Sequence, residues 1–170
     1  CSGSNVTLTA TALNSASVTD INGNVYPTVN IGTQICMQKN LNVSKYKNGD
    51  VIPQVTNATQ WAALTTGAWC WYNNDSATYA ATYGKLYNWY AVNDSRGLAP
   101  EGWHVPNEAE WNSLKNFIDP NSINLVESSV AGGDLKDTGT INWLTPNTGA
   151  TNKSGFKGLP NGTRLLNGTF

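Results

Sequence analysis

The clearest pattern of apolar and polar positions lies in residues 83–114, where it predicts two short helices. The first helix would carry its apolar side chains at spacings of three and four residues, which place them on one face. These residues are Tyr83, Leu86, Tyr87, Tyr90 and Ala91. Asn93, Asp94 and Gly97 follow. They would end the helix, because short polar side chains compete for the backbone and glycine weakens helices.

The second predicted helix has a clear start signal. Asn107 is a favourable N-cap, and Glu110 stands three residues later. Its carboxylate can reach back to the backbone N–H of the cap, as in a capping box. Glu108 and Glu110 fall in the first turn, where the helix dipole favours negative charge. We therefore interpret both acids as helix-start residues.

The aromatic residues around this helix start are expected to be core. Trp111, Leu114 and Phe117 recur every three residues and predict a buried stripe, and Trp103 precedes them. His104, the single histidine, has no second residue at metal-ligand spacing. We expect a packed, hydrogen-bonded histidine rather than a catalytic one.

Strand signals are short. Asn22-Gly23 separates two apolar-rich runs and is a strong hairpin signal, and residues 30–32 predict a further turn. Residues 68–72 predict a buried strand closed by a polar turn at 73–76. Residues 121–170 predict only short strands and long loops. The expected class is therefore α+β, with two short helices, small irregular antiparallel sheets and long loops.

Composition narrows the function. The chain has 170 residues, enough for one domain, with 10 basic and 11 acidic residues and a net charge of −1. This balance excludes an electrostatic nucleic-acid binder. Charged residues make up only 12%, while seven Trp and seven Tyr are many for this length. The mixture is typical of secreted β-rich proteins, and no apolar run is long enough for a transmembrane segment.

The leading segment, residues 1–17, leaves two alternatives open. Cys1 could be the lipidated first residue of a bacterial lipoprotein. Alternatively, the segment ends a preceding immunoglobulin-like repeat, because Val6, Leu8 and Ala10 alternate with threonines. The odd cysteine count, Cys1, Cys36 and Cys70, suggests a free thiol, a lipid-bearing cysteine or a partner elsewhere.

Candidate chemistry is sparse. Asn74, Asp75, Asn93 and Asp94 offer hard oxygen ligands in loops and are weak calcium candidates, although such clusters mostly form turns. No other cofactor is expected. Asp134 and Asp137 lack a second acidic cluster for glycosidase chemistry, and we interpret them as an exposed acidic turn.

Two further features suggest display and binding. Asp75-Ser76-Ala77 resembles the O-glycosylation motif of Bacteroidetes secreted proteins, so Ser76 is a candidate glycosylation site in an exposed turn. A glycan binder needs exposed aromatic rings beside amide and carboxylate groups. We expect Trp61 and Trp143 to be such ligand-facing rings.

Several motifs carry a specific resemblance. They are VTDINGNVYPTVNIGTQ, LNVSKYKNGDVIP, YGKLYNWYAVNDSRGLAPEGWHVPNEAEWNSL and NTGATNKSGFKGLPNGTR. Over residues 18–170 the chain resembles the Fibrobacter succinogenes major paralogous domain, found in secreted and surface-lipoprotein chains of Bacteroidetes and Fibrobacteres. The resemblance implies an extracellular or outer-membrane surface location and no established chemistry. The family usually has Trp at the position of Cys36, so we expect a small buried residue there.

A more distant resemblance concerns the fold. GWHVPNEAEW is similar to a stretch of formylglycine-generating-enzyme-like domains, which implies a C-type-lectin-like fold. The catalytic cysteine pair of those enzymes has no counterpart here. The family continues beyond the position of Phe170, so we expect final strands, and a partner for Cys70, to be missing. Either the natural polypeptide continues or another chain supplies or accepts a β-strand.

The leading functional hypothesis is a non-catalytic cell-surface or secreted recognition and adhesion module for a glycan or protein partner. The second is a structural unit of a larger surface assembly or filament. The third is a relative of the formylglycine-generating enzymes.

Overall fold

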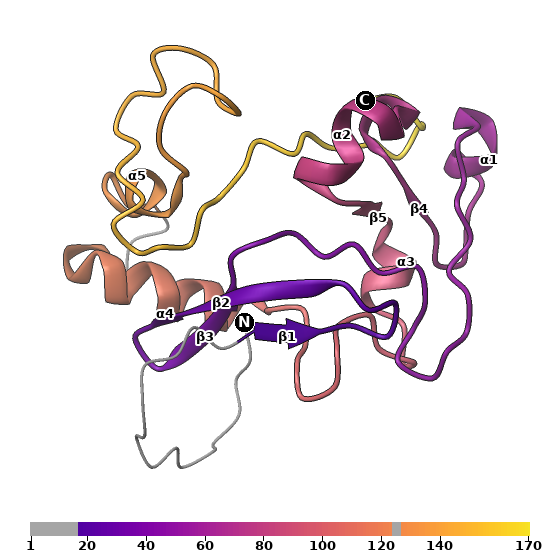
Figure 1. Cartoon of the computed structure of the whole chain (residues 1–170), viewed down its shortest axis with the longest axis horizontal. Helices are drawn as coiled ribbons and strands as arrows, with labels where there is room; N and C mark the ends of the chain where they lie inside the picture. The colour runs from indigo at the N-terminus through magenta and orange to yellow at the C-terminus, as the bar shows by residue number, and fades with distance from the viewer. Residues whose placement is uncertain (1–16, 124–126) are drawn as a thin grey trace. The chain divides into compact units, whose positions relative to one another are not determined.

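The computed structural model describes residues 17–123 and 127–170. Within them lie five short strands, five α-helices and two 3-10 helices, labelled in Figure 1. The strands are β1 (Ser17–Thr19), β2 (Val25–Ile31), β3 (Gln34–Met37), β4 (Trp69–Cys70) and β5 (Leu86–Tyr87). The helices are α1 (Ala58–Ala62), η1 (Tyr72–Asn74), α2 (Ser76–Tyr83), α3 (Trp89–Val92), α4 (Glu108–Ile118), η2 (Pro120–Ser122) and α5 (Ala131–Leu135). The fold is mixed, with small antiparallel pairs, as predicted, but with more helices than the two expected.

The chain divides into two compact units, each with its own core. The described residues of the first unit are 17–18, Tyr26–Lys39 and Gly102–Pro160, and the second contains Thr19–Val25, Asn40–Glu101 and Asn161–Phe170. Nearly all of the predicted leading segment, including Cys1, lies outside the described residues; only Ser17 falls within them, in β1.

The hairpin predicted at Asn22-Gly23 is present, because β1 and β2 are neighbours in one sheet, but its turn begins earlier. The Gly23 N–H donates to the Asp20 carbonyl at 2.9 Å, and Gly23 has φ +84°. The Asp20 carboxylate accepts from the backbone N–H groups of Asn22 at 2.8 Å and Asn24 at 3.0 Å. Glycine adopts this left-handed conformation without a steric penalty, so Asp20 and Gly23 together determine the turn.

The core of the first unit lies between the β2–β3 pair and α4. β2 and β3 are antiparallel, with Ile31 opposite Gln34. The turn predicted at residues 30–32 is present but lies at residues 32–33, because β2 continues to Ile31. Ile31, Cys36 and Leu114 are buried together, and Figure 1 shows α4 beside these strands. Cys36 has no exposed surface, which confirms the small buried residue expected at this position.

The capping box of α4 is present as predicted. The Glu110 N–H donates to Asn107 Oδ1 at 3.0 Å, and the Asn107 N–H donates to Glu110 Oε2 at 2.9 Å. His104 Nε2 lies 2.7 Å from Glu110 Oε1, which confirms a hydrogen-bonded histidine. Its side chain is 43% exposed, however, so the expectation that it is packed was wrong.

The buried stripe on α4 is narrower than predicted. Leu114 is buried, but Trp111 is 43% and Phe117 61% exposed, and Trp103 is only half-buried. A step of three residues rotates a side chain by about 60° away from the starting face, so Trp111 and Phe117 flank Leu114 instead of sharing its direction. Trp111 instead makes an edge contact with Phe156, with ring centroids 6.0 Å apart.

The single helix predicted from Tyr83 onward is divided into three elements. α2 ends at Tyr83, and Gly84 follows with φ +67°. β5 then pairs with β4, with Tyr87 opposite Trp69, and α3 begins after the cap Asn88. The left-handed glycine stops helix propagation, and pairing with β4 satisfies the backbone of the next residues.

The second unit has two apolar clusters. One contains Val43, Tyr46, Ile52, Trp69, Ala91 and Leu98, and the other contains Trp61, Ala68 and Cys70. The strand predicted at 68–72 is confirmed only for β4. The polar turn predicted at 73–76 is instead η1 followed by the start of α2.

Residues 121–123 and 127–170 contain a helix that the sequence did not predict, α5, and no named strand. Asp134 lies in α5 and is 9% exposed, and it accepts from Thr151 Oγ1 at 2.5 Å. Asp137 is half-buried. The exposed acidic turn expected here was therefore wrong, because Asp134 is used to hold the loop that contains Thr151.

Candidate functional site

The second unit carries a surface hollow of about 350 Å³ beside α3. Hydroxyl, amide, aromatic and charged side chains line it together. The lining residues are Thr65, Thr66, Gly67, Trp89, Tyr90, Asn93, Asp94, Ser95 and Arg96. This combination of an aromatic surface with convergent polar groups is typical of small-ligand sites.

Two aromatic residues of α3 are exposed at this hollow. Trp89 is 68% and Tyr90 46% exposed, whereas Ala91 is fully buried. α3 is only four residues long, and Ala91 packs into the core next to Trp69 and Leu98. Because one face of so short a helix is used for packing, Trp89 and Tyr90 lie on the faces that remain.

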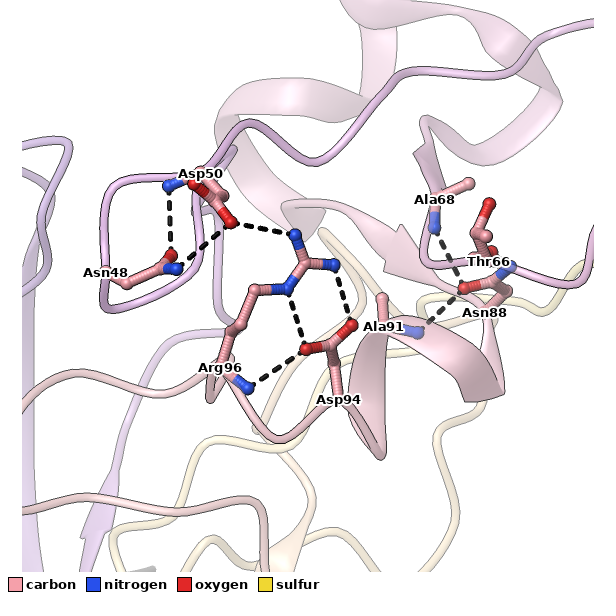
Figure 2. Close-up of polar contacts among 8 residues, drawn as sticks. All are labelled: Asn48, Asp50, Thr66, Ala68, Asn88, Ala91, Asp94 and Arg96. Atoms are coloured by element: carbon pink, nitrogen blue, oxygen red, sulfur yellow. Dashed lines mark hydrogen bonds and ion pairs between the residues drawn. The ribbon is translucent and has the colours of Figure 1, made fainter.

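Asn88 connects the 65–68 loop to α3 with one side chain, as Figure 2 shows. Its Oδ1 accepts from the N–H groups of Ala68 at 2.9 Å and Ala91 at 3.0 Å. Its Nδ2 donates to the Thr66 carbonyl at 2.8 Å. The Ala91 bond is an N-cap bond, and the other two bonds fix the 65–68 loop against the start of α3.

Gly67 is required by the core behind the hollow. A Cβ at this position would collide with the Tyr46 hydroxyl and would lie 3.0 Å from the Ala91 Cα. The Tyr46 hydroxyl is buried and makes no hydrogen bond of good geometry within the described residues. Burial, and then the negative charge of Asp94, raise the pKa of the Tyr46 phenol. The phenol therefore stays protonated.

An ion-pair cluster forms one side of the hollow (Figure 2). Arg96 donates from Nε at 2.9 Å and from Nη2 at 2.8 Å to the two oxygens of Asp94. Its Nη1 donates to Asp50 Oδ2 at 3.0 Å, and Asn48 Nδ2 donates to the same oxygen at 3.0 Å. The guanidinium carbon lies 4.0 Å from the Tyr46 ring centroid. The arginine is thus held at its edge and at its face.

These contacts shift the ionisation of the cluster. Hydrogen bonds from the Arg96 side chain and backbone hold the pKa of Asp94 well below its usual range. Hydrogen bonds from Arg96 and Asn48 lower the pKa of Asp50, and its carboxylate partners raise the pKa of Arg96. All three groups therefore stay charged across the physiological range.

Comparison with known proteins identifies the family. Residues 29–170 match the Fibrobacter succinogenes major domain, a span that includes most of both units. The chain belongs to this family. No curated protein and no solved structure matches the chain. The match fits a bacterial source. Across the described residues of this Fibrobacter major domain, no helix is long and apolar enough to cross a membrane.

The four calcium candidates of this domain fall at two places. Asn93 and Asp94 line the hollow, where Arg96 binds Asp94. Asp75 Oδ1 accepts from the Thr78 N–H at 3.1 Å and caps α2, and Asn74 Nδ2 donates to the Thr56 carbonyl at 3.0 Å. Across residues 17–123 and 127–170, no group of three or more His, Cys, Asp and Glu side chains could hold a metal ion.

Of the two predicted ligand-facing aromatics, Trp61 is buried, so its expected exposure was wrong, whereas Trp143 keeps part of its surface exposed. Trp61 is 7% exposed, packs with Ala68 and Cys70, and lies under the Arg164 guanidinium at 4.4 Å. Trp143 is half-buried, and its Nε1 donates to the Gly158 carbonyl at 3.0 Å. Lys136 Nζ lies 4.4 Å over its ring. A cation thus lies over one face of each ring.

Trp89 is the residue that sequence reasoning missed. It lies next to the predicted apolar face of residues 83–91 but does not belong to it. An aromatic residue off the buried face of an amphipathic segment is a signal for an exposed ring. The same signal fails for Tyr90, which belongs to that predicted face and is 46% exposed, so it does not decide which rings are exposed.

The remaining predicted sites are Ser76 and the cysteines. Ser76 is exposed, but it is the first residue of α2 and not part of a turn. Cys36 and Cys70 are free and buried in the described structure. Burial raises the pKa of both thiols, so both are protonated and unreactive at neutral pH.

Proposed function

We propose that this Fibrobacter major domain is a non-catalytic recognition module, secreted or displayed on a bacterial surface, that binds glycans through the hollow beside α3. The observation that carries the proposal is the 68% exposed indole of Trp89 among hydroxyl, amide and paired charged groups. Sugars present an apolar C–H face, which stacks on an indole, and a rim of hydroxyls, which need hydrogen-bonding partners.

The elements around Trp89 support binding with little loss of entropy. Asn88 fixes both the 65–68 loop and the start of α3, and Gly67 lets the loop pack closely on the core. Trp has only two side-chain torsions, so little freedom is lost when a ligand stacks on it. A preorganised aromatic surface is the kind of residue arrangement that dominates binding energy.

The scaffold proposed for this site is C-type-lectin-like, with small irregular sheets that support exposed loops. We expect binding without calcium, because both Asp94 oxygens already accept hydrogen bonds from Arg96. A chelator should therefore leave glycan affinity unchanged.

The test is a glycan array that carries plant, fungal and bacterial oligosaccharides, probed with the wild-type chain and two variants. Trp89→Ala should abolish the array signal. Trp111→Ala is the matched control, since it removes an exposed tryptophan from the other unit. It should leave the signal intact. Absence of any signal for the wild type, or an unchanged signal for Trp89→Ala, would contradict the proposal.

One observation favours the second candidate, a structural unit of a surface assembly. Ile141 is 97% and Leu144 91% exposed on a loop of the first unit. Exposed apolar side chains of this kind can mark association surfaces. Sedimentation velocity at increasing concentration tests this candidate. Self-association that Ile141→Ser with Leu144→Ser abolishes would favour assembly, and a monodisperse monomer would exclude it.

A further inference from the structure

We infer that the hollow selects neutral glycans over acidic ones, and that Asp94 sets this selectivity by occupying Arg96. The inference rests on the proposed glycan function and names the ligand class of the same site. It assigns Arg96 a role opposite to the usual role of an exposed arginine in a sugar site, which is to bind a carboxylate.

The positive charge at the hollow is already compensated. Asp94 and Arg96 are the charged residues among the described residues that line it. Asp94 receives both Nε and Nη2 of Arg96, and Asp50 receives Nη1. The three side chains together carry a formal charge of −1. An acidic sugar approaching this surface therefore meets repulsion and, among the described residues that line the hollow, no cation that lacks a carboxylate partner.

Displacement of Asp94 by a ligand carboxylate would also cost free energy. The backbone N–H of Arg96 donates to Asp94 Oδ1 at 2.9 Å, and the Gly97 N–H donates to the Asp94 carbonyl at 3.0 Å. The local turn thus fixes Asp94 beside Arg96 before any ligand arrives. A competing carboxylate would have to replace a bidentate, charge-assisted contact that is already formed within the chain.

The remaining polar groups of the hollow can bind neutral hydroxyls. The guanidinium keeps N–H groups beyond the three in these contacts, and the hydroxyls of Thr65, Thr66 and Ser95 and the amide of Asn93 also line the hollow. A sugar hydroxyl both donates and accepts, so it can bind beside the ion pair without breaking it.

The experiment compares saccharides that differ only in a C6 carboxylate. The two pairs are β-1,4-mannohexaose with the β-1,4-mannuronate hexamer, and cellohexaose with its C6-oxidised form. Isothermal titration calorimetry should show that, in at least one pair, the neutral saccharide binds at least about fivefold more tightly than its acidic counterpart. One unscreened charge contact can produce a ratio of this size. Neutral binding should not change between low and high salt.

Charge-neutralising variants test the role of Asp94. Asp94→Asn keeps an Oδ1 acceptor for the backbone N–H and Nε of Arg96, but it removes the negative charge and the Oδ2 acceptor of Nη2. It should raise affinity for the acidic hexamers about tenfold, with salt-sensitive binding. Asp50→Asn should give a smaller gain in affinity for the acidic hexamers. Because this side chain is 53% exposed, the variant remains a usable test if Asp94→Asn misfolds. Asp75→Asn makes the same charge change at a helix cap that Asn also satisfies, and it should give none.

The outcomes separate the two claims. Equal or tighter binding of the acidic hexamers to the wild type, lost in Trp89→Ala, would overturn the inference and leave the proposed function standing. Gains of equal size in Asp94→Asn and Asp75→Asn, or no gain in Asp94→Asn and Asp50→Asn, would also overturn it. No binding of any of the four saccharides would overturn the inference, whereas only the absence of a Trp89-dependent signal on the glycan array would contradict the proposed function.

Discussion

Asn88 shows how much one side chain can position in this chain. A single amide caps α3, accepts from the 65–68 loop and donates back to that loop. Trp89 is the first residue of α3, so these bonds help to fix its position. An asparagine that ends a strand and begins a helix therefore matters more for the hollow than most residues that line it.

Replacing Asn88 should cost more than removing an ordinary cap. We expect Asn88→Ala to lower the free energy of unfolding by about 2 kcal/mol, because a cap and two further hydrogen bonds are lost. Asn57→Ala, which removes the single side-chain cap bond of α1, is the control and should cost about 1 kcal/mol. Urea denaturation measures both, and equal losses would contradict the special role of Asn88.

For Tyr46 we expect the opposite result, namely that removing a polar group does not lower stability. Its ring is buried under Arg96, but its hydroxyl has no hydrogen bond of good geometry in the described part of the chain. Tyr46→Phe removes a buried polar group that has little compensation, so stability should change by less than about 0.5 kcal/mol or increase. A loss of more than about 1 kcal/mol would mean that the hydroxyl has a partner in solution, such as Asp94 or a water molecule.

At the scale of elements, local sequence signals predicted the structure correctly where a single pair of residues determines it. The capping box of α4 depends only on Asn107 and Glu110, and both bonds are present. The break of residues 83–92 into α2, β5 and α3 was not predictable from periodicity. It depends on pairing with β4, more than ten residues earlier in the chain, which a helical pattern cannot reveal.

The width of the α4 stripe gives an element-scale prediction. Leu114→Ala should cost about 2–5 kcal/mol, because Leu114 is buried with Ile31 and Cys36. Trp111→Ala should cost only about 1 kcal/mol, since it loses mainly the edge contact with Phe156. Chemical denaturation of the two variants checks the order. A larger loss for Trp111→Ala would show that the stripe is buried after all.

At the scale of the molecule, carboxylates make stability depend on pH. The pKa values of Asp50, Asp75, Asp94 and Glu110 are all lowered in the fold. For Glu110, burial acts to raise the pKa, but the hydrogen bonds from Asn107 and His104 outweigh it. A lowered pKa in the folded state stabilises the protein above the ordinary pKa, and this stabilisation is lost as the pH falls through the folded value.

We therefore expect a melting temperature that is flat from about pH 5 to 8 and that falls below about pH 4. Circular dichroism melts over this range measure it. Asp94→Asn should make the acid-side decline shallower, because one of the titrating groups is gone. A melting temperature that rises on acidification to pH 3 would contradict these ion-pair assignments.

The family and the mixed fold class could be read from the sequence, because the motifs around GWHVPNEAEW and the turn residues are local. The hollow could not, since it requires the 65–67 loop, α3 and the 93–96 turn to meet. Trp61 is buried with Ala68 and Cys70 and beneath Arg164, which lies about a hundred residues later, and no local pattern in the sequence indicates these contacts. Exposure of an aromatic ring is a tertiary property.

The most direct test of the account asks which tryptophan senses a glycan. The chain has seven tryptophans, so protein labelled with 5-fluorotryptophan gives a ¹⁹F resonance for each, assignable by single Trp→Phe variants. On titration with the tightest-binding neutral hexasaccharide of the calorimetry, the Trp89 resonance should shift progressively, and those of the buried Trp61 and Trp69 should not. A saturable shift of another resonance with Trp89 unchanged, or no shift of any, would contradict the assignment of the hollow as the glycan site.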